Sequence, residues 1–464
     1  MTVRRVLPVG DVSRARTKPP VPPSAAWEIG DPVAGRRFAQ IGDLPLEGYR
    51  HSVAISSVLG SPSEPITNTA IAPTYQHSST GNIPPASELS GSRTNNPTRL
   101  LRNGALPHVT MAYEAWGTLN EAQDNAVLIL HALTGDAHVT GGKAPGQLAA
   151  GWWSELVGPG RPIDTNKNFV VAPNVLGGCS GSTGPASRSP RGTRWGGNFP
   201  RLTIRDQVNA EIRLAQHLGI VRWRLVLGAS MGGLRALEWS LLGPENGIEV
   251  DGLCAIATTA ATSADQIAWA HPQLAAIRLD PGYHGGNYYD LYDDAGPHQG
   301  LAIARQIAHT TYRSASELDT RFQRFPQSGE DPFVDGRYAI QSYLDHHGDK
   351  LARRFDANTY LVLTEAMFTH DLGRDRGGTD AALASITAKT LVVAVDSDRL
   401  YPVAQSARIA SQVPMCELAI INSAHGHDGF LIEFAQLEPV IRNFLTQLDP
   451  AATEPSPPAI GLVA

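Results

Sequence analysis

One serine in this sequence has neighbours that could turn its hydroxyl into a nucleophile. Ser230 stands in the string Gly228-Ala-Ser-Met-Gly232, between the apolar run 225–227 and a stretch with helical spacing. A serine on a tight turn from strand to helix is forced out of the sheet, and backbone N–H groups at the helix N-terminus then face any oxyanion formed beside it. Small residues at 228 and 232 suit such a turn, because larger side chains would collide with its opposite arm. We interpret Ser230 as a candidate catalytic nucleophile.

A serine hydroxyl is a poor nucleophile at neutral pH, so it needs a base within hydrogen-bond reach and a carboxylate that orients the base. The segment after the last predicted strand offers His425 and His427 as bases. The end of the preceding strand offers Asp396 and Asp398 as carboxylates. Singly, such residues are more often surface, capping or turn residues. Together with Ser230 they fall at three strand ends in the chain order that an α/β-hydrolase fold requires.

The oxyanion of an acyl-transfer reaction would be bound by two backbone N–H groups. One belongs to Met231, which follows the nucleophile, and the other to Leu133 in the loop after an early strand. Removing one such donor typically costs about 3 kcal/mol of transition-state stabilisation. Leu133 is equally suited to ordinary core packing, so this expectation concerns its backbone alone.

The composition disfavours a nucleic-acid-binding, disulfide-rich or membrane protein. The chain has 464 residues, a net charge of −6 and no dense Lys/Arg run, which disfavours a nucleic-acid partner. Its three cysteines, Cys179, Cys254 and Cys416, are far apart, so we expect neither a disulfide framework nor a metal site. The N-terminus lacks the apolar run of a signal peptide, and no stretch approaches the length of a membrane span. We expect a cytoplasmic protein without a membrane partner.

The elements that would position these residues alternate between strand and helix. The apolar runs 126–130 and 169–173 lack polar alternation, which is typical of strands covered by helices on both faces. A helix is predicted from Thr203, as N-cap with Asp206 three residues on, to Gly219 as its stop. Further strands are predicted at 225–229, 252–257, 390–395 and 417–421, with a helix at 233–242. The alternation predicts an α/β fold with a mostly parallel sheet and helices on both faces.

The remaining segments divide the chain into parts. The interval between the strands near 257 and 390 is too long for one crossover and has helical patterns, so we predict an inserted helical lid at 259–375 over the serine. The patterns predict core segments at 27–47, 104–258 and 376–447, a disordered N-terminal tail at 1–26, a low-complexity insertion at 48–103 and a flexible C-terminal tail at 448–464. The strand-like stretches on either side of the insertion are either one interrupted strand pair or a separate N-terminal arm.

Six longer strings resemble the homoserine O-acetyltransferase family of methionine biosynthesis. They are residues 131–138, 174–185, 199–206, 228–239, 397–402 and 426–431, within a likeness that runs from about residue 104 to 445. The resemblance implies acyl transfer in two half-reactions: Ser230 takes the acetyl group of acetyl-CoA, and the L-homoserine hydroxyl then accepts it. In the family the carboxylate matches Asp398, which makes Asp396 the runner-up, and the base matches His427.

The resemblance also implies how the acceptor is held. The arginine that binds the substrate in the family maps onto Arg305 in the lid, where a guanidinium suits an amino-acid carboxylate. Asp428 matches the position that holds the substrate ammonium, and Tyr312 is a further candidate contact. The family uses acetyl-CoA as co-substrate with no resident cofactor, and its members form homodimers through the lid. The insertion at 48–103 departs from the short family turn, and we assign it no function.

Other functions remain open at this point. A triad alone does not distinguish a transferase from an α/β-hydrolase esterase, because either water or an alcohol can accept the acyl group. Relatives on the same scaffold transfer succinyl groups to serine or homoserine, or acetylate natural-product alcohols, and a few pocket residues can decide between them. A catalytically inactive binding module would predict a broken triad, and this sequence has an intact set. A charged clamp made by Arg305 and Asp428 favours an amino-acid acceptor.

Overall fold

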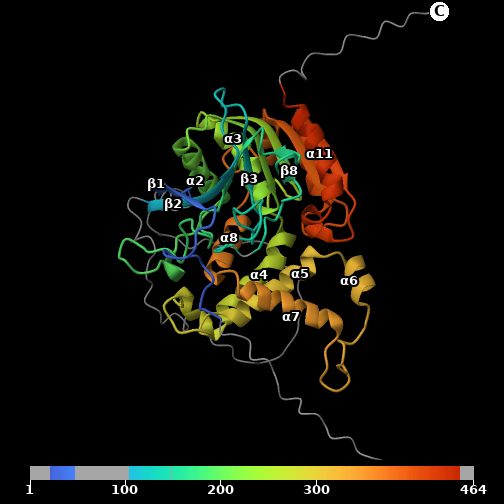
Figure 1. Cartoon of the computed structure of the whole chain (residues 1–464). Helices are drawn as coiled ribbons and strands as arrows, with labels where there is room; N and C mark the ends of the chain where they lie inside the picture. Colours follow the sequence, from blue (N-terminus) through green and yellow to red (C-terminus); the bar gives the residue numbers. More distant parts are fainter. Residues whose placement is uncertain (1–20, 48–103, 148, 450–464) are drawn as a thin grey trace, which may run out of the picture.

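A computed structural model describes residues 21–47, 104–147 and 149–449 (Figure 1). Its centre is an eight-stranded sheet with the order β1-β2-β6-β3-β7-β8-β9-β10. Neighbours from β6 to β10 are parallel, whereas β2 is antiparallel to both β1 and β6. The strands are β1 (Arg37–Pro45), β2 (Ala105–Trp116), β3 (Ala126–Leu130), β6 (Phe169–Pro173), β7 (Arg222–Ala229), β8 (Glu249–Ile256), β9 (Lys389–Val395) and β10 (Cys416–Ile421), with β4 (Val157–Gly158) and β5 (Ile163–Asp164) in a separate pair. The predicted α/β fold with a mostly parallel sheet is confirmed.

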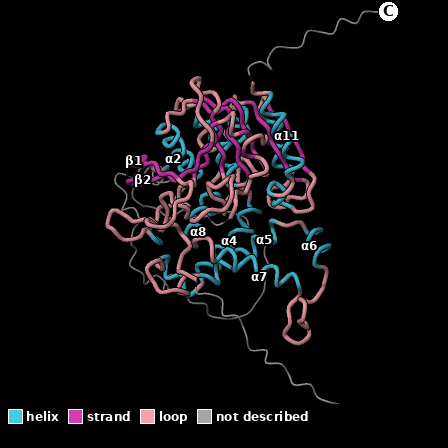
Figure 2. The backbone as a smooth tube through the Cα atoms, in the orientation of Figure 1, coloured by secondary structure: helices cyan, strands magenta, loops and turns pink. Residues whose placement is uncertain are grey.

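Helices cover both faces of this sheet (Figure 2). One face carries α2 (Ile204–His217), α3 (Met231–Glu245) and α10 (Val403–Gln412), and the other carries α11 (Phe434–Thr446). The sequence of strand β7 contains a continuous apolar run at 225–227 because both faces of the strand are covered. Val226 packs in the cluster with α2 and α3, while its neighbours Leu225 and Leu227 pack in the cluster with α11. Both side-chain directions are therefore buried, as in parallel sheets generally.

Helix α2 begins as its sequence predicts. Thr203 and Asp206 form a reciprocal capping box, in which each side chain accepts the backbone N–H of the other. After the helix, Gly219 has φ +71°, a conformation that favours glycine. The box fixes the start of α2, which packs against α3, the helix that follows the predicted nucleophile.

The lid comprises five helices at one end of the sheet (Figure 1). They are α4 (Ala264–Leu279), α5 (His298–Tyr312), α6 (Ala315–Phe322), α7 (Ala339–Ala352) and α8 (Ala357–Phe368), all within the predicted range 259–375. Helix α5 packs against α4, α7 and the 3₁₀ turn η5 (Gly426–Leu431) of the core. The lid thus contacts the segment that carries the predicted base. Within the described residues, no helix is both long enough and apolar enough to cross a membrane.

The predicted tails, 1–26 and 448–464, overlap the described residues at their inner ends. Ser24 donates its hydroxyl hydrogen to Asp356 Oδ1 at 2.8 Å, which ties residues after 20 to the lid. Asp449 Oδ1 lies 2.5 Å from Arg224 Nη2, beyond the end of α11. Polar contacts with distant residues hold both stretches, and local composition does not reveal such contacts. The rest of both tails and the insertion at 48–103 lie outside the described residues.

Strands β1 and β2 meet at the two edges of the insertion. Pro45 pairs with Ala105, and the Leu46 N–H donates to the Gly104 carbonyl at 3.1 Å. This confirms one interrupted strand pair and rules out a separate N-terminal arm. The backbone on either side of the insertion is therefore close enough for a short turn to join it.

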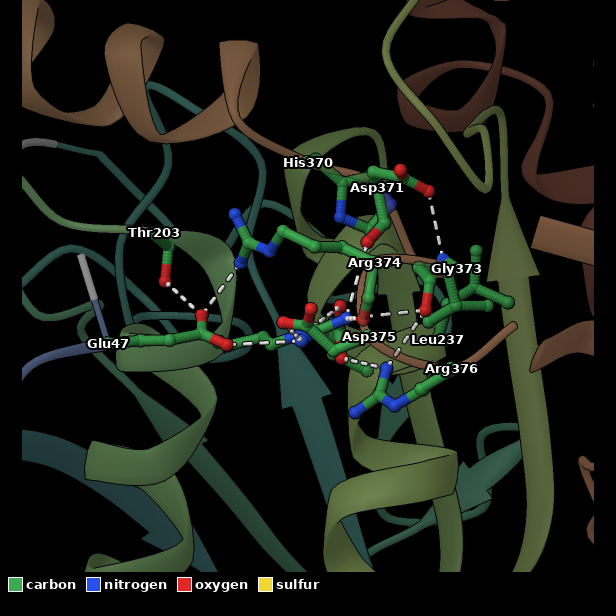
Figure 3. Close-up of polar contacts among 12 residues, drawn as sticks. Glu47, Thr203, Leu237, His370, Asp371, Gly373, Arg374, Asp375 and Arg376 are labelled. Atoms are coloured by element: carbon green, nitrogen blue, oxygen red, sulfur yellow. Dashed lines mark hydrogen bonds and ion pairs between the residues drawn. The ribbon is translucent and has the colours of Figure 1, made fainter. Parts of the chain in front are cut away.

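Ion pairs fix Glu47, the last described residue before the insertion (Figure 3). Its carboxylate accepts hydrogen bonds from Thr203 Oγ1 at 3.2 Å, Arg205 Nη1 at 3.0 Å and Arg374 Nη2 at 2.7 Å. Arg205 also bonds to Glu238 on α3 at 3.1 Å. These contacts tie the edge of the insertion to α2, to α3 and to the segment that follows the lid.

Replacing residues 48–103 with an Asn-Gly turn should leave a folded, active protein. The flanking strands already meet, and long surface insertions have a small thermodynamic cost, so the free energy of unfolding should change by less than about 1 kcal/mol. Glu47→Ala in the full chain should instead lose about 1 to 2 kcal/mol, because it removes the carboxylate partner of partly exposed Arg374 and one carboxylate partner of Arg205, which keeps Glu238. Chemical denaturation of both variants measures these values. An unfolded deletion variant would contradict this account of the hairpin.

Candidate active site

Ser230 occupies a strained turn between β7 and α3. Its backbone has φ +57° and ψ −123°, an unusual conformation for a residue with a side chain. A Cβ on Gly228 would collide with the Gly232 carbonyl, and one on Gly232 would collide with the Leu130 carbonyl. The Ser230 N–H donates to the Ile256 carbonyl at 2.9 Å. The glycines let the two arms of the turn approach closely, as their spacing predicts.

Three residues from three strand ends form a continuous hydrogen-bonded chain. His427 Nε2 lies 2.9 Å from Ser230 Oγ, and His427 Nδ1 lies 2.6 Å from Asp398 Oδ2. The other Asp398 oxygen accepts the N–H groups of Leu400 and Tyr401 at 2.8 and 2.9 Å. All three side chains of the chain are buried. The arrangement can pass a proton from the serine to an imidazole whose orientation a carboxylate holds.

The structure separates the two alternatives from the serine. Asp396 is exposed, and its Oδ1 accepts the Ser423 N–H at 2.9 Å, so it fastens the turn before η5. His425 Nδ1 lies 3.3 Å from Arg313 Nη1 and 3.7 Å from Glu317 Oε1. Neither residue contacts Ser230, whereas Asp398 and His427 complete its chain.

The surroundings of His427 stabilise its protonated form, so its pKa is higher than that of a histidine in water. Burial acts to lower the pKa of its imidazole, but the charge and hydrogen bond of Asp398 outweigh burial and raise it above the ordinary 6.5. The rings of Tyr401, Phe430 and Tyr312 surround the imidazole, with centroids 5.2, 5.4 and 5.8 Å away. The base is therefore held in an aromatic enclosure beside one carboxylate.

The loop that carries Leu133 is fixed to the nucleophile helix. Arg235, on α3, donates to the His131 carbonyl at 2.6 Å and pairs with buried Glu211. His131 Nε2 accepts the Val175 N–H at 3.1 Å, which leaves Nδ1–H to donate to the Ala132 carbonyl at 2.8 Å. Burial, followed by the charge of Arg235, lowers the pKa of His131 to about 3, so this ring is neutral. Leu133 and Met231 thus lie on two elements held together by one arginine.

The lid places its predicted residues beside the base. The guanidinium carbon of Arg305 lies 5.1 Å from the Tyr312 ring centroid, and the Tyr312 ring in turn faces His427. Asp428 Oδ2 lies 3.3 Å from Arg313 Nε, an ion pair that the sequence did not predict. Burial raises the pKa of Asp428, while the Arg313 charge acts in the opposite direction.

Sequence reasoning also gave no role to Tyr401, Arg235 and Arg313. Tyr401 and Arg235 lie in strings quoted above, and Arg313 directly follows Tyr312, but only side-chain geometry distinguishes these residues from their neighbours. A cavity of about 50 Å³ opens against Leu133, Tyr312 and Tyr401. A larger cavity of about 490 Å³ lies between β1, β2 and residues 178–195 and touches none of the predicted site residues.

Known proteins support this assignment of fold and chemistry. The alpha/beta hydrolase fold family matches residues 125–433. A homoserine O-acetyltransferase of Thermobifida fusca is 49% identical over 433 residues, which cover 93% of this chain and 99% of that protein. A homoserine O-acetyltransferase of Mycolicibacterium smegmatis is 48% identical over 347 residues, which cover 74% of this chain and 90% of that protein.

Solved structures of an acetyltransferase and of an esterase share the fold of this chain. The homoserine O-acetyltransferase of Bacillus anthracis has a TM-score of 0.67 and 27% identity, over 74% of this chain and 94% of that one. Esterase E22 has a TM-score of 0.67 and 28% identity, over 74% of this chain and 95% of that one. The scaffold is therefore found with both an acyltransferase and an esterase.

The two aspartates should differ sharply on substitution. Asp398→Asn should lower kcat by about 10⁴-fold, because an amide cannot hold the imidazole in the required tautomer. Asp396→Asn keeps an acceptor oxygen at an exposed site and should change kcat by no more than about twofold. Measured turnover of the two purified variants makes the comparison, and the reverse ranking would move the triad.

The pH profile gives an independent test of His427. Its neutral form must accept the serine proton, so kcat/KM should fall as the pH drops through the raised pKa of the free enzyme. The acidic limb should have its midpoint above 6.5 and should move to lower pH in Asp398→Asn, which removes the stabilising charge. A limb that is the same in both proteins would exclude the Asp398 charge as the cause of the shift.

Proposed function

The chain belongs to the homoserine O-acetyltransferase family of the α/β-hydrolase fold, and from this membership we propose how its own residues carry out the reaction. Ser230 acts as the nucleophile, His427 as the general base and acid, and Asp398 as the carboxylate that orients the imidazole. The hydrogen-bonded chain among these three residues is the observation that carries the proposal. Acetyl-CoA and L-homoserine are the two substrates, and the steps below involve no resident cofactor.

The first half-reaction acetylates the enzyme. His427 Nε2 accepts the Ser230 hydroxyl proton while Oγ attacks the thioester carbon of acetyl-CoA. The carbonyl oxygen becomes an oxyanion, which the N–H groups of Met231 and Leu133 bind. The carbon–sulfur bond then breaks, and the departing CoA sulfur takes the proton from His427. We assign the thioester end of the donor to the side of the cavity formed by Leu133 and Tyr401.

The second half-reaction repeats these steps with the acceptor. The homoserine hydroxyl gives its proton to His427 and attacks the acetyl-serine carbonyl carbon. The same two N–H groups bind the second oxyanion. The bond to Ser230 Oγ breaks, Oγ recovers the proton from His427, and O-acetylhomoserine leaves. One imidazole thus serves both halves in sequence.

Charged groups under the lid suit an amino-acid acceptor. Arg305 would bind the substrate carboxylate, and Tyr312, stacked on that guanidinium, would form one wall of the acceptor site. Asp428 would hold the substrate ammonium while retaining its contact with Arg313. An apolar ester has no groups that would use this clamp. The clamp therefore favours homoserine over the acceptors of an esterase.

A hydrolase remains the second candidate, because esterase E22 is as similar in structure to this chain as the acetyltransferase of Bacillus anthracis is. The first test is CoA release from acetyl-CoA with and without homoserine, with Ser230→Ala as control. A transferase should release CoA continuously only with homoserine, and Ser230→Ala should release none. Continuous release without an acceptor would identify a hydrolase. Release from succinyl-CoA but not from acetyl-CoA would replace the donor.

We also propose a cytoplasmic homodimer that associates through the lid. Apolar side chains are exposed on α4 and α5, which pack together: Ile267, Leu279 and Ile303 are 36%, 82% and 47% exposed. The cytoplasmic location is supported by the cysteines. All three cysteines of the chain are free, as is usual in a reducing compartment, and acetyl-CoA is available there.

Light scattering tests the assembly. The protein should have a mass of about twice 49.6 kDa, and Ile303→Asp should shift it toward the monomer by placing a charge in the contact. A monomer at every concentration would exclude the dimer.

A further inference from the structure

We propose that Arg354 is a second arginine that binds the carboxylate of the acceptor amino acid, together with Arg305. The inference rests on the proposed function, since it concerns the acceptor of the second half-reaction. Arg354 lies between α7 and α8, and no sequence motif assigned it a role. Two geometric observations support it, its hydrogen bond to the oxyanion loop and the absence of a carboxylate oxygen within 4 Å in the described chain, and the charge of Arg305 also acts on it.

One hydrogen bond ties the Arg354 guanidinium to the loop of the second oxyanion donor. Its Nη1 donates to the Thr134 carbonyl at 3.1 Å, and Thr134 directly follows Leu133. A guanidinium has five N–H donors in a rigid plane. This single contact leaves most of the Arg354 donors for another acceptor.

Within the described residues, neither Arg305 nor Arg354 has a carboxylate oxygen within 4 Å. Arg305 instead lies over the Tyr312 ring, and Arg354 donates to the Thr134 carbonyl. Other buried arginines of this protein are neutralised: Arg235 pairs with Glu211, and Arg205 pairs with Glu47 and Glu238. A partly buried cation without a counter-ion is costly, so an anion that enters between these two arginines would be strongly stabilised.

The two guanidinium groups also interact with each other. Burial lowers the pKa of Arg354, and the positive charge of Arg305 lowers it further, while Asp136, Cys179 and Tyr312 act in the opposite direction. Arginine keeps its proton in proteins, so the repulsion persists. A carboxylate has two oxygens, one for each guanidinium, and would relieve this repulsion.

The distance between the hydroxyl and the carboxylate of homoserine suits a site with both its base and its cations near Tyr312. Arg305 and Arg354 both act electrostatically on Tyr312, whose ring centroid is 5.8 Å from that of His427. Three carbons separate the homoserine hydroxyl from its carboxylate, so a carboxylate held beside Tyr312 leaves the hydroxyl within reach of the base. The CoA phosphates lie a whole pantetheine arm away from the thioester. The anion beside the base is therefore the acceptor carboxylate.

The test separates the two half-reactions. In ping-pong kinetics, kcat/KM for each substrate reports only the half-reaction of that substrate. Arg354→Gln should lower kcat/KM for homoserine by about 10- to 100-fold, the usual worth of a charge-assisted contact, and leave kcat/KM for acetyl-CoA within about twofold. With 3-amino-1-propanol, which is homoserine without its carboxylate, Arg354→Gln and the wild type should react equally.

Arg337→Gln serves as the matched control. This exposed lid arginine is paired with Glu330 and Asp345, and its loss should leave both kcat/KM values unchanged. Arg354→Lys keeps one charge and should recover part of the homoserine kcat/KM. If Arg354→Gln does not fold, which circular dichroism reveals, the Lys variant and the two acceptors carry the comparison.

Each contrary result overturns the inference in a distinct way. Equal losses for acetyl-CoA and homoserine would mean that Arg354 only positions the Thr134 loop. A loss confined to acetyl-CoA would mean that it binds a CoA phosphate. Unchanged homoserine kinetics, or an equal loss with 3-amino-1-propanol, would remove the carboxylate contact. Failure of the proposed function is distinguishable, because the wild type itself would then not acetylate homoserine.

Discussion

The tight turn between β7 and α3 is the constraint on which the rest of the site depends. It holds Ser230 at a positive φ that only the close approach of Gly228 and Gly232 permits. One turn along α3, Arg235 reaches back to the His131 carbonyl at 2.6 Å. The proposed nucleophile and the loop of the proposed second oxyanion donor are therefore both positioned by one helix. A shift of α3 would move both together and preserve their spacing, which acyl transfer needs.

The charges under the lid add what the triad lacks, which is a preference for one acceptor. Ser230, His427 and Asp398 would serve water as well as an alcohol. Arg305 and Arg354 present positive charge with no carboxylate partner in the described chain, while Asp428 lies close by and is balanced by Arg313. A zwitterionic amino acid matches this distribution of charge. In this account, the core performs the chemistry and the lid selects its substrate.

The sequence predicted those parts of the structure that depend on local patterns. Buried strands, the α2 capping box and the order of serine, acid and base follow from apolar runs, from caps and from residue order. Helices α6, α10 and α11 were not predicted. Helices α6 and α10 are short, with 8 and 10 residues, whereas the helical spacing of apolar residues 434, 437, 441 and 444 in α11 was overlooked. Arg354 and the Arg313–Asp428 pair depend on side chains far apart in the chain, and no local pattern contains that information. The polar contacts of Ser24 and Asp449 depend on distant residues in the same way.

The account's central claim is an acetyl group carried on Ser230 between the two substrates. Mass spectrometry of the peptide that contains Ser230, after mixing the protein with acetyl-CoA and quenching, tests this claim most directly. The account predicts one added acetyl group on that serine, which disappears when homoserine is added and reappears as O-acetylhomoserine. If the peptide stays unmodified while O-acetylhomoserine accumulates, the acetyl group passes directly between substrates, and the claim is wrong.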